Sequence, residues 1–216
     1  MNLEEARTQM LGQQIRAWEV LDNRVLGVLG SIAREAFVPE TCRDLAFADL
    51  EIPLDHGQNM MAPKIEGRLL QALRLDPNDS VLEIGTGSGF LTACLAKLAG
   101  SVVTVDIFED FSHGARSTIE SLGMTNIEYR TEDALAMDAK DRYDAIAVTG
   151  SVPELDDHFI RMLRPGGRLF VIVGREPVME ARVVTMLERG QTTQDSLFES
   201  VVKPLINAER PEPFVL

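Results

Sequence analysis

From Ser80 onwards, short β-rich runs alternate with amphipathic segments, and this alternation constrains the fold more than any other feature of the chain. Strands separated by helical patterns are typical of βαβ units and a parallel sheet. Connections of this length suit a doubly wound arrangement. We therefore predict a mostly parallel α/β sheet over residues 77–216, with helices from about Leu91, Asp110 and Glu154. The predicted parallel strands are residues 80–84, 101–105, 126–130, 143–148 and 168–173.

The helical pattern stops after Gly174. Residues 181–187 and 195–201 are two further strand candidates, and the polar turn Arg189-Gly190-Gln191 lies between them. Two β-rich runs joined by a short glycine-containing turn are typical of an antiparallel hairpin. We place this hairpin at the edge of the sheet, which would then contain seven strands.

The first third of the chain has a different character. Residues 3–17 and 25–33 carry apolar residues at helical spacing, and Pro39 and Pro53 then interrupt the pattern. Neither a linker nor an internal repeat separates this region from the rest. We therefore expect one domain over residues 1–216, in which residues 1–76 form a helical and substrate-loop region that caps the core.

The charge of the chain restricts its partners. The 216 residues carry a formal net charge of −13, which would repel a nucleic-acid backbone or an anionic membrane surface. No apolar stretch approaches the roughly 20 residues that a membrane-spanning helix needs, and the chain starts with acidic residues where a signal peptide would be basic. We expect a cytoplasmic protein with no nucleic-acid or membrane partner.

The cysteines and histidines do not have the spacing of a metal site. Cys42 and Cys94 lie far apart in unlike surroundings, and His56, His113 and His158 are scattered along the chain. We predict two free thiols and no metal ion.

A glycine-rich turn follows the first predicted strand. Gly85, Gly87 and Gly89 alternate with Thr86 and Ser88, and glycine lets a backbone approach a ligand closely. A dinucleotide fingerprint would need glycine where Phe90 stands. The order E-x-G-x-G-x-G, with Glu83 before the glycines, is similar instead to class I methyltransferases. It predicts an S-adenosylmethionine (SAM) site, where a carboxylate would favour the sulfonium of the cofactor. An ordinary strand-to-helix turn is the alternative.

Two more acids end the next two strands. Asp106, followed by Ile107, stands about 20 residues after the glycine turn, where a carboxylate can accept hydrogen bonds from ribose hydroxyls. Asp133, followed by Ala134, stands at the end of the third strand, where it resembles the adenine-binding element of the same superfamily. Helix N-caps and turns are the alternative roles for both aspartates.

Several segments together resemble the protein-L-isoaspartate O-methyltransferase family. They are Arg7-x-x-Met10-x-x-Gln13, Ala33-Arg34-Glu35-x-Phe37-Val38-Pro39, Ala46-Phe47-Ala48-Asp49-x-x-Ile52-Pro53-Leu54, Gly57-Gln58-x-x-x-x-Pro63 and Leu73-x-Leu75, together with the glycine turn. The resemblance covers residues 7–174. It implies a Rossmann-like fold with a seven-stranded sheet, SAM as cofactor, and isoaspartyl-containing proteins or peptides as substrates.

The loop before Pro63 departs from the family pattern. Asn59 and Met61 stand where the family carries hydroxyl residues, the second of them near the methyl-transfer centre, and Ala62 replaces a glutamine. The resemblance therefore assigns positions 59 and 61 to the catalytic region. A methionine thioether cannot donate a hydrogen bond to a substrate carboxylate, whereas it packs well in irregular apolar gaps.

Three functions remain open on the sequence. The first is carboxyl methylation of damaged aspartyl residues, which needs no general base because a carboxylate is already a nucleophile. The second is methylation of another acceptor in a more apolar pocket, for which His56 is the one nearby loop histidine. The third is a SAM-binding protein without transfer activity. The sequence does not specify the oligomeric state.

Overall fold

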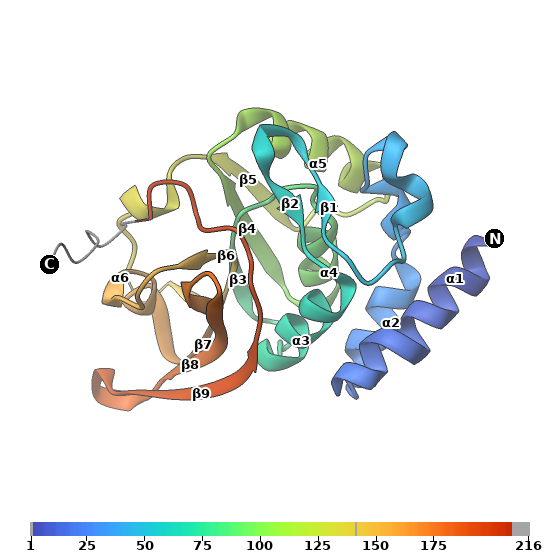
Figure 1. Ribbon diagram of the computed structural model, residues 1–216. Coiled ribbons are helices and arrows are strands. Elements are labelled where there is room, and N and C mark those ends of the chain that lie inside the picture. The colour runs from blue at the N-terminus through green and yellow to red at the C-terminus, as the bar shows by residue number, and fades with distance from the viewer. Residues whose placement is uncertain (1, 141, 209–216) are drawn as a thin grey trace, which may run out of the picture.

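The fold is built on one large sheet. The computed structural model describes residues 2–140 and 142–208. Five parallel strands, β3 to β7, are followed by two antiparallel strands, β8 and β9, in the order β5-β4-β3-β6-β7-β8-β9 (Figure 1). This confirms the predicted seven-stranded, mostly parallel sheet. The strands are β3 (Ser80–Ile84), β4 (Ser101–Asp106), β5 (Ile127–Thr131), β6 (Tyr143–Val152), β7 (Leu163–Arg175), β8 (Val178–Met186) and β9 (Thr192–Glu199).

The strand order reverses between β3 and β6. The chain runs outwards through β4 and β5, and then returns to place β6 on the other side of β3. In an open α/β sheet, ligands bind in the crevice at the carboxyl ends of the strands beside such a reversal. The topology therefore directs attention to the residues that follow β3, β4 and β6.

The antiparallel part of the sheet is larger than predicted. β8 pairs with β9 as expected, for example Val183 with Asp195, but β8 also pairs with β7, from Val178 to Thr185. The predicted strands 143–148 and 168–173 likewise extend to Tyr143–Val152 and Leu163–Arg175. The apolar run of β6 is interrupted by Thr149, Gly150 and Ser151, although the end of the strand is buried. The apolar run of β7 covers only the buried middle of that strand, because residues on both sides of it are partly exposed.

Most helices begin close to the predicted positions. The helices α4 (Phe90–Leu98) and α5 (Glu109–Ser121) start within one residue of them, and α2 is Asn23–Ser31. The first helix changes its winding: α1 (Leu3–Gln9) continues as a π-helical stretch and a 3₁₀ turn.

Two helices differ from the prediction. The helix expected from Glu154 is the single turn α6 (Asp157–Ile160), because the side chain of Asp156 accepts the backbone N–H of His158 at 2.8 Å and caps the helix there. Helix α3 (Pro63–Leu73) was not predicted. Its proline occupies the first turn, where the missing N–H has no intrahelical partner, so this proline starts the helix rather than interrupting the chain.

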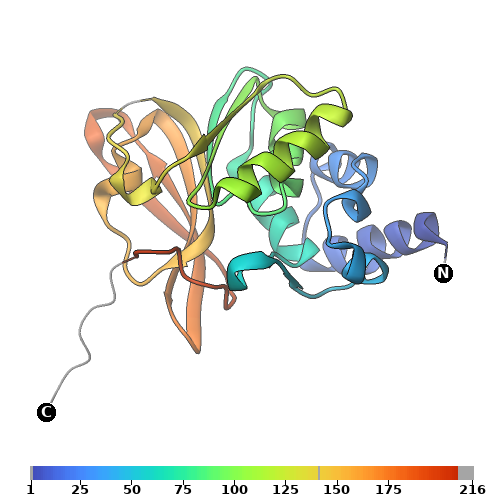
Figure 2. The ribbon, with the colours of Figure 1, turned by 90° about the horizontal axis from the view of Figure 1, so that it is seen from above.

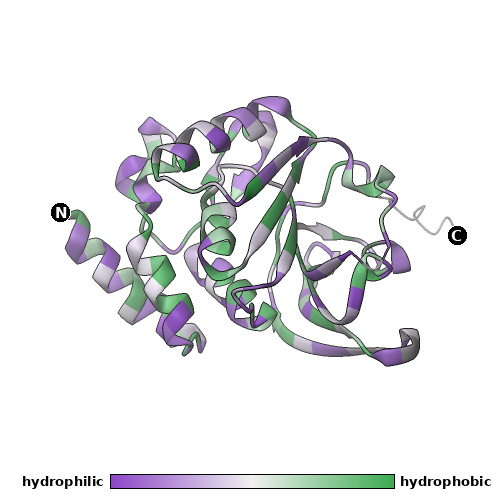
Figure 3. Cartoon of the chain, turned by 180° about the vertical axis from the view of Figure 1, so that it is seen from behind, coloured by the Kyte–Doolittle hydropathy of each residue, from purple (hydrophilic) through white to green (hydrophobic). Residues whose placement is uncertain are grey.

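Apolar side chains cover both faces of the sheet. On β3, Val81 joins the cluster that contains residues of α1 to α5, whereas Leu82 and Ile84 join the cluster that contains Phe159 of α6. This two-sided burial explains the continuous apolar runs of the central strands, which Figure 3 shows in green. Figure 2 shows the long helices on one side of the parallel strands. Within the described residues, no helix is long and apolar enough to span a membrane.

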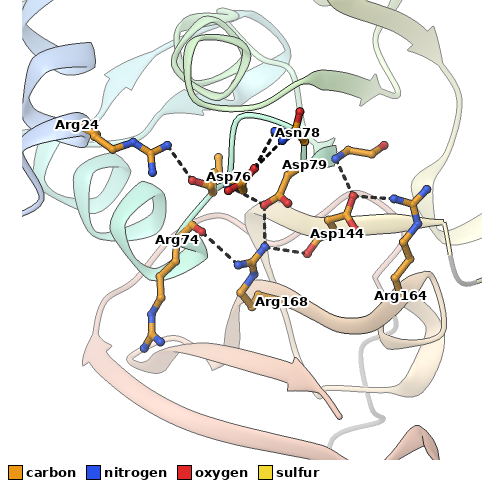
Figure 4. Close-up of polar contacts among 10 residues, drawn as sticks. Arg24, Arg74, Asp76, Asn78, Asp79, Asp144, Arg164 and Arg168 are labelled. Atoms are coloured by element: carbon orange, nitrogen blue, oxygen red, sulfur yellow. Dashed lines mark hydrogen bonds and ion pairs between the residues drawn. The ribbon is translucent and has the colours of Figure 1, made fainter. Parts of the chain in front are cut away.

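A polar network holds the ends of β3, β6 and β7 that lie opposite the predicted site (Figure 4). The guanidinium of Arg168 donates to Asp79 at 2.7 Å and to the carbonyl of Arg74 at 3.1 Å. The carboxylate of Asp144 accepts from the Ser80 N–H at 2.8 Å and from Arg164 at 2.7 Å. These bonds tie the start of β3 to its neighbour β6 and to β7, the next strand in the sheet.

The substitution Asp144→Ala is expected to lower the free energy of unfolding by about 1–3 kcal/mol, because a half-buried carboxylate loses two charge-assisted hydrogen bonds. Urea unfolding of the variant measures this loss. The control is Asp138→Ala, which removes an exposed carboxylate and should leave the midpoint unchanged. Equal midpoints for the two variants would contradict a structural role for Asp144.

Candidate active site

A cavity lies at the carboxyl ends of β3, β4, β5 and β6, beside the reversal of strand order. Ten of the twelve residues that the sequence assigns to the site line it. They are Asn59, Met61, Gly85, Thr86, Gly87, Ser88, Asp106, Ile107, Asp133 and Ala134. Glu83 and Gly89 do not line it. Among the described residues, no group of three or more His, Cys, Asp or Glu side chains could hold a metal ion.

The glycine turn is fixed by its neighbours. Gly85 has φ +95°, and a side chain there would collide with the hydroxyl of Thr149, which donates to the carbonyl of Ile84 at 2.9 Å. Gly89 has φ +86°, and an added Cβ would lie 2.6 Å from the Cβ of Ala115 on α5. Both positions therefore require glycine for conformation and for close packing. Gly89 supports the turn, while Gly85 also faces the cavity.

Glu83 lies beneath the turn. Its side chain is fully buried, and its Oε2 accepts hydrogen bonds from Thr92 at 2.5 Å and from Thr104 at 2.6 Å. The hydroxyls of Thr104 and Thr86 are 2.7 Å apart, so the chain of hydrogen bonds reaches the turn. Burial raises the pKa of Glu83 to about 8. The carboxyl is therefore largely protonated at neutral pH and placed to hold the turn rather than to contact a ligand.

This raised pKa has a measurable consequence. The stability that Glu83 contributes is fully present below its unfolded pKa of about 4.3 and is lost as the pH rises through its folded pKa of about 8. The variant Glu83→Gln is therefore expected to show a smaller loss of unfolding free energy between pH 5 and 8 than the wild-type chain. Urea unfolding at both pH values measures the difference, with the exposed Glu40→Gln as control. Equal losses in all three proteins would contradict the assignment.

Asp106 ends β4 with its carboxylate at the cavity wall. It is 8% exposed, and it accepts the backbone N–H groups of Gly87 at 2.9 Å and of Phe108 at 3.0 Å. Burial raises the pKa of this carboxyl above its usual range, while the backbone hydrogen bonds act in the opposite direction. Each carboxylate oxygen retains a free lone pair. Asp106 can thus accept two hydroxyl groups from a bound ligand in a fixed orientation.

Asp133 is the N-cap that the sequence offered as one of its two roles, and it also lines the cavity. Its Oδ1 accepts the Leu135 N–H at 2.9 Å and caps the 3₁₀ turn Ala134–Ala136. Its Oδ2 accepts the side-chain amide of Asn207 at 2.9 Å, and the residue also lines the cavity. The N-cap is therefore present, and the same carboxylate faces the cavity.

The loop that carries Asn59 and Met61 forms the opposite wall. The strands β1 (Ile52–Pro53) and β2 (Asn59–Met60) pair as a two-stranded ribbon. The amide of Asn59 donates to Glu51 at 2.6 Å, and Met61 is 7% exposed. The methionine is therefore packed and at the same time part of the cavity wall.

A buried ion pair positions this wall, and the sequence analysis did not single it out as part of the site. Arg34 is 1% exposed and pairs with Glu66, which is 2% exposed and lines the cavity. The Arg34 guanidinium also donates to the carbonyl of Met61 at 2.7 Å and to that of Ala46 at 2.8 Å. Burial raises the pKa of Glu66 to about 7 even though Arg34 acts in the opposite direction. The available signal was the position of Arg34 in the family-like segment 33–39; Glu66 gave none, because Lys64 and Arg68 are charged neighbours in the sequence.

His56 lies beside the cavity but does not line it. Its ring stacks on Phe108 with 4.0 Å between ring centroids, and its Nε2 is 2.8 Å from a carboxylate oxygen of Asp110. Phe111 contacts the edge of the same ring, and both phenylalanines line the cavity. The histidine thus stabilises an aromatic wall, which favours its hydrogen-bonding role over that of a general base.

The C-terminal segment 202–206 completes the cavity. The backbone N–H of Ser151, near the end of β6, donates to the carbonyl of Lys203 at 2.9 Å, and the N–H of Leu205 donates to the carbonyl of Ser151 at 2.9 Å. The ammonium of Lys203 also donates to the carbonyl of Gly57. The sequence analysis assigned no site residue to the C-terminal stretch. Its first part, 196–199, completes the sheet edge in β9, and residues 213–216 lie outside the described residues.

A reversed α/β sheet with a glycine turn after β3 and acids after β4 and β5 defines the class I methyltransferase architecture. The family model of protein-L-isoaspartate(D-aspartate) O-methyltransferase (PCMT) matches residues 5–210. The chain belongs to this family, which confirms the resemblance read from its motifs.

Individual relatives agree. The chain is 35% identical to protein-L-isoaspartate O-methyltransferase 2 of Pelobacter propionicus, over 96% of this chain and 93% of the relative. It is also 35% identical to protein-L-isoaspartate O-methyltransferase of Rhodopseudomonas palustris, over 94% of this chain and 96% of the relative. A Plasmodium falciparum structure assigned to PCMT, in complex with S-adenosyl-L-homocysteine, shares the fold with a TM-score of 0.78 and 19% identity. The match covers 95% of this chain and 98% of the Plasmodium falciparum chain.

Proposed function

We propose that the protein is a SAM-dependent carboxyl O-methyltransferase that acts on isoaspartyl residues of damaged proteins or peptides. The observation that carries this proposal is the family match over residues 5–210, with the glycine turn, Asp106 and the 59–61 loop around one cavity. We further propose that residues 1–216 act as one domain, because the apolar cluster is continuous from the N-terminal helices into the sheet. Two free cysteines support a cytoplasmic location.

The cavity fits the cofactor in charge and in shape. Gly85, Thr86, Gly87 and Ser88 offer a wall free of bulky side chains, which suits the amino-acid part of SAM. Asp106, with Ile107 beside it, would accept the ribose hydroxyls. Asp133 and Ala134 would contact the adenine, in which case the Asn207 amide shares or yields its place on Asp133. Glu83 and Gly89 would act through the turn.

Bound SAM supplies a methyl group that its sulfonium has already activated. The protein then has to position a carboxylate oxygen in line with this group and exclude water. A carboxylate needs no proton removed, which agrees with a site where the nearby histidine, His56, is engaged by Asp110. Asn59 and Met61 would shape the acceptor side of the cavity.

A second candidate function is methylation of a different acceptor on the same scaffold. The observation that favours it is Met61, which lines the cavity and has a thioether where the family carries a hydroxyl. A small, more apolar acceptor would fit such a wall better than a charged peptide. A SAM-binding protein without transfer activity is the third possibility that the experiment has to separate.

The test is transfer of labelled methyl from SAM to an isoaspartyl peptide, with the normal aspartyl peptide as control and SAM binding followed by calorimetry. Turnover on the isoaspartyl peptide alone is the expected result. SAM binding without turnover on this peptide would overturn the proposal in favour of the second function. SAM binding without methyl transfer to any member of a broad acceptor panel would instead support the third function, a SAM-binding protein without transfer activity.

A further inference from the structure

A second cavity adjoins the one that contains the glycine turn. The two share five lining residues, which are Glu51, Asn59, Val202, Lys203 and Pro204. In Figures 1 and 2 the red C-terminal segment runs beside the cyan loop of residues 55–57, to which Lys203 is hydrogen-bonded. These shared residues form the junction between a cofactor cavity and the space from which an acceptor would approach.

The charge at this junction is uneven. Five acidic residues line the first cavity: Glu51, Glu66, Asp106, Glu132 and Asp133. Among its described lining residues, Lys203 is the one basic side chain. An approaching carboxylate would be repelled by ionised acids in a partly dehydrated space unless a cation lies near its path. Lys203 is the residue that can supply that cation.

The Lys203 ammonium has donors to spare. It has three N–H donors, of which one reaches the backbone carbonyl of Gly57. In the part of the chain that the structure describes, it forms no ion pair, whereas Lys64 and Arg68 of α3 pair with Asp49 and Glu19, respectively. Arg34 likewise pairs with Glu66. No carboxylate of the described chain thus lies within ion-pair distance of the Lys203 ammonium, although several line the same cavity.

The other polar groups at the junction are engaged with each other. The amide of Asn59 donates to Glu51 at 2.6 Å, which orients both side chains. Met61 offers no hydrogen-bond donor from its side chain. The loop therefore lacks the hydroxyl donor at position 61, and the C-terminal segment, which also lines the cavity, provides a charged donor in Lys203.

We propose that Lys203 binds and orients the acceptor carboxylate, and so takes the role of the hydroxyl that the family carries at position 61. The residues that flank the acceptor in the peptide would then enter the second cavity. This inference rests on the proposed function. One carboxylate oxygen would be held by the ammonium and the other would form the new C–O bond. The S–CH₃ bond breaks, its electron pair stays on sulfur, and no proton moves. The ester product is neutral, so Lys203 would hold it less strongly than the substrate.

The experiment compares steady-state kinetics of the wild-type chain with Lys203→Met, Lys203→Arg and the control Lys97→Met, which changes an exposed lysine outside both cavities. Lys203→Met is expected to raise the KM for the isoaspartyl peptide about tenfold, because one charge-assisted hydrogen bond is lost. Its Kd for SAM should stay within about twofold of wild type. Lys203→Arg keeps the charge and should keep most of the affinity. Added salt should raise the wild-type KM and affect that of Lys203→Met much less.

Two results would overturn the inference while leaving the proposed function intact. One is an unchanged peptide KM in Lys203→Met. The other is a loss of SAM affinity that accounts for all of the change in KM, since Lys203 would then act only by fastening the C-terminal segment to Gly57. A wild-type protein that binds SAM and gives no turnover on the isoaspartyl peptide would overturn the proposed function and this inference together.

Discussion

Replacement of Arg34 by methionine is expected to lower the free energy of unfolding by about 3–5 kcal/mol. The guanidinium is 1% exposed, pairs with Glu66, and donates to the carbonyls of Ala46 and Met61. Its removal leaves a buried carboxylate without a partner, and this penalty is much larger than the net stabilisation of an intact pair. Urea unfolding at pH 8 measures the loss.

The pH dependence of this effect identifies its cause. Burial already raises the pKa of Glu66 to about 7 with Arg34 present, and without the guanidinium that pKa moves higher still. An acid with a raised folded pKa contributes stability at low pH and loses it as the pH rises. Arg34→Met should therefore be less destabilising at pH 5 than at pH 8.

The double variant Arg34→Met/Glu66→Met provides the matched control. It replaces both charges with apolar side chains, and such replacements of buried pairs are often neutral or stabilising. We expect it to recover most of the lost stability at pH 8. An equal loss in the single and the double variant would show that the contacts of Arg34 with the carbonyls of Ala46 and Met61 matter more than its charge.

The sequence predicts the sheet well because its signals are local. The apolar runs of β3, β4 and β6 are buried on both faces, and the glycines of the turn are required by backbone geometry at Gly85 and Gly89. Helix α3 was not predicted, although its first residue, Pro63, is typical of the first turn of a helix.

The rest of the site depends on contacts between distant residues. Arg34 meets Glu66, and Lys203 meets Gly57, only because the chain folds. Position along the sequence did suggest that Glu83 is near the cofactor. The alternation of side chains along β3, however, turns it towards α4, where Thr92 donates to it. One residue of offset in a strand thus decides whether an acid faces a ligand or the core.

The variant Asp106→Ala is expected to weaken SAM binding about 100-fold, because two charge-assisted hydrogen bonds of the carboxylate to the ribose hydroxyls would be lost. The structure adds a second reason. The same carboxylate accepts the N–H groups of Gly87 at 2.9 Å and of Phe108 at 3.0 Å, so its removal also loosens the turn that lines the cavity. Isothermal titration calorimetry with SAM measures the combined effect.

Asp106→Asn separates the two reasons. The amide keeps one oxygen that can accept a hydrogen bond, but its nitrogen cannot accept the second N–H. We expect an intermediate SAM affinity, and unfolding measurements without cofactor show how much stability the turn loses in each variant. If affinity fell in proportion to stability, Asp106 would act through the turn alone. A SAM affinity within threefold of wild type in Asp106→Ala would remove Asp106 from the binding site, and the acid after β4 would be a turn residue that the cavity happens to expose.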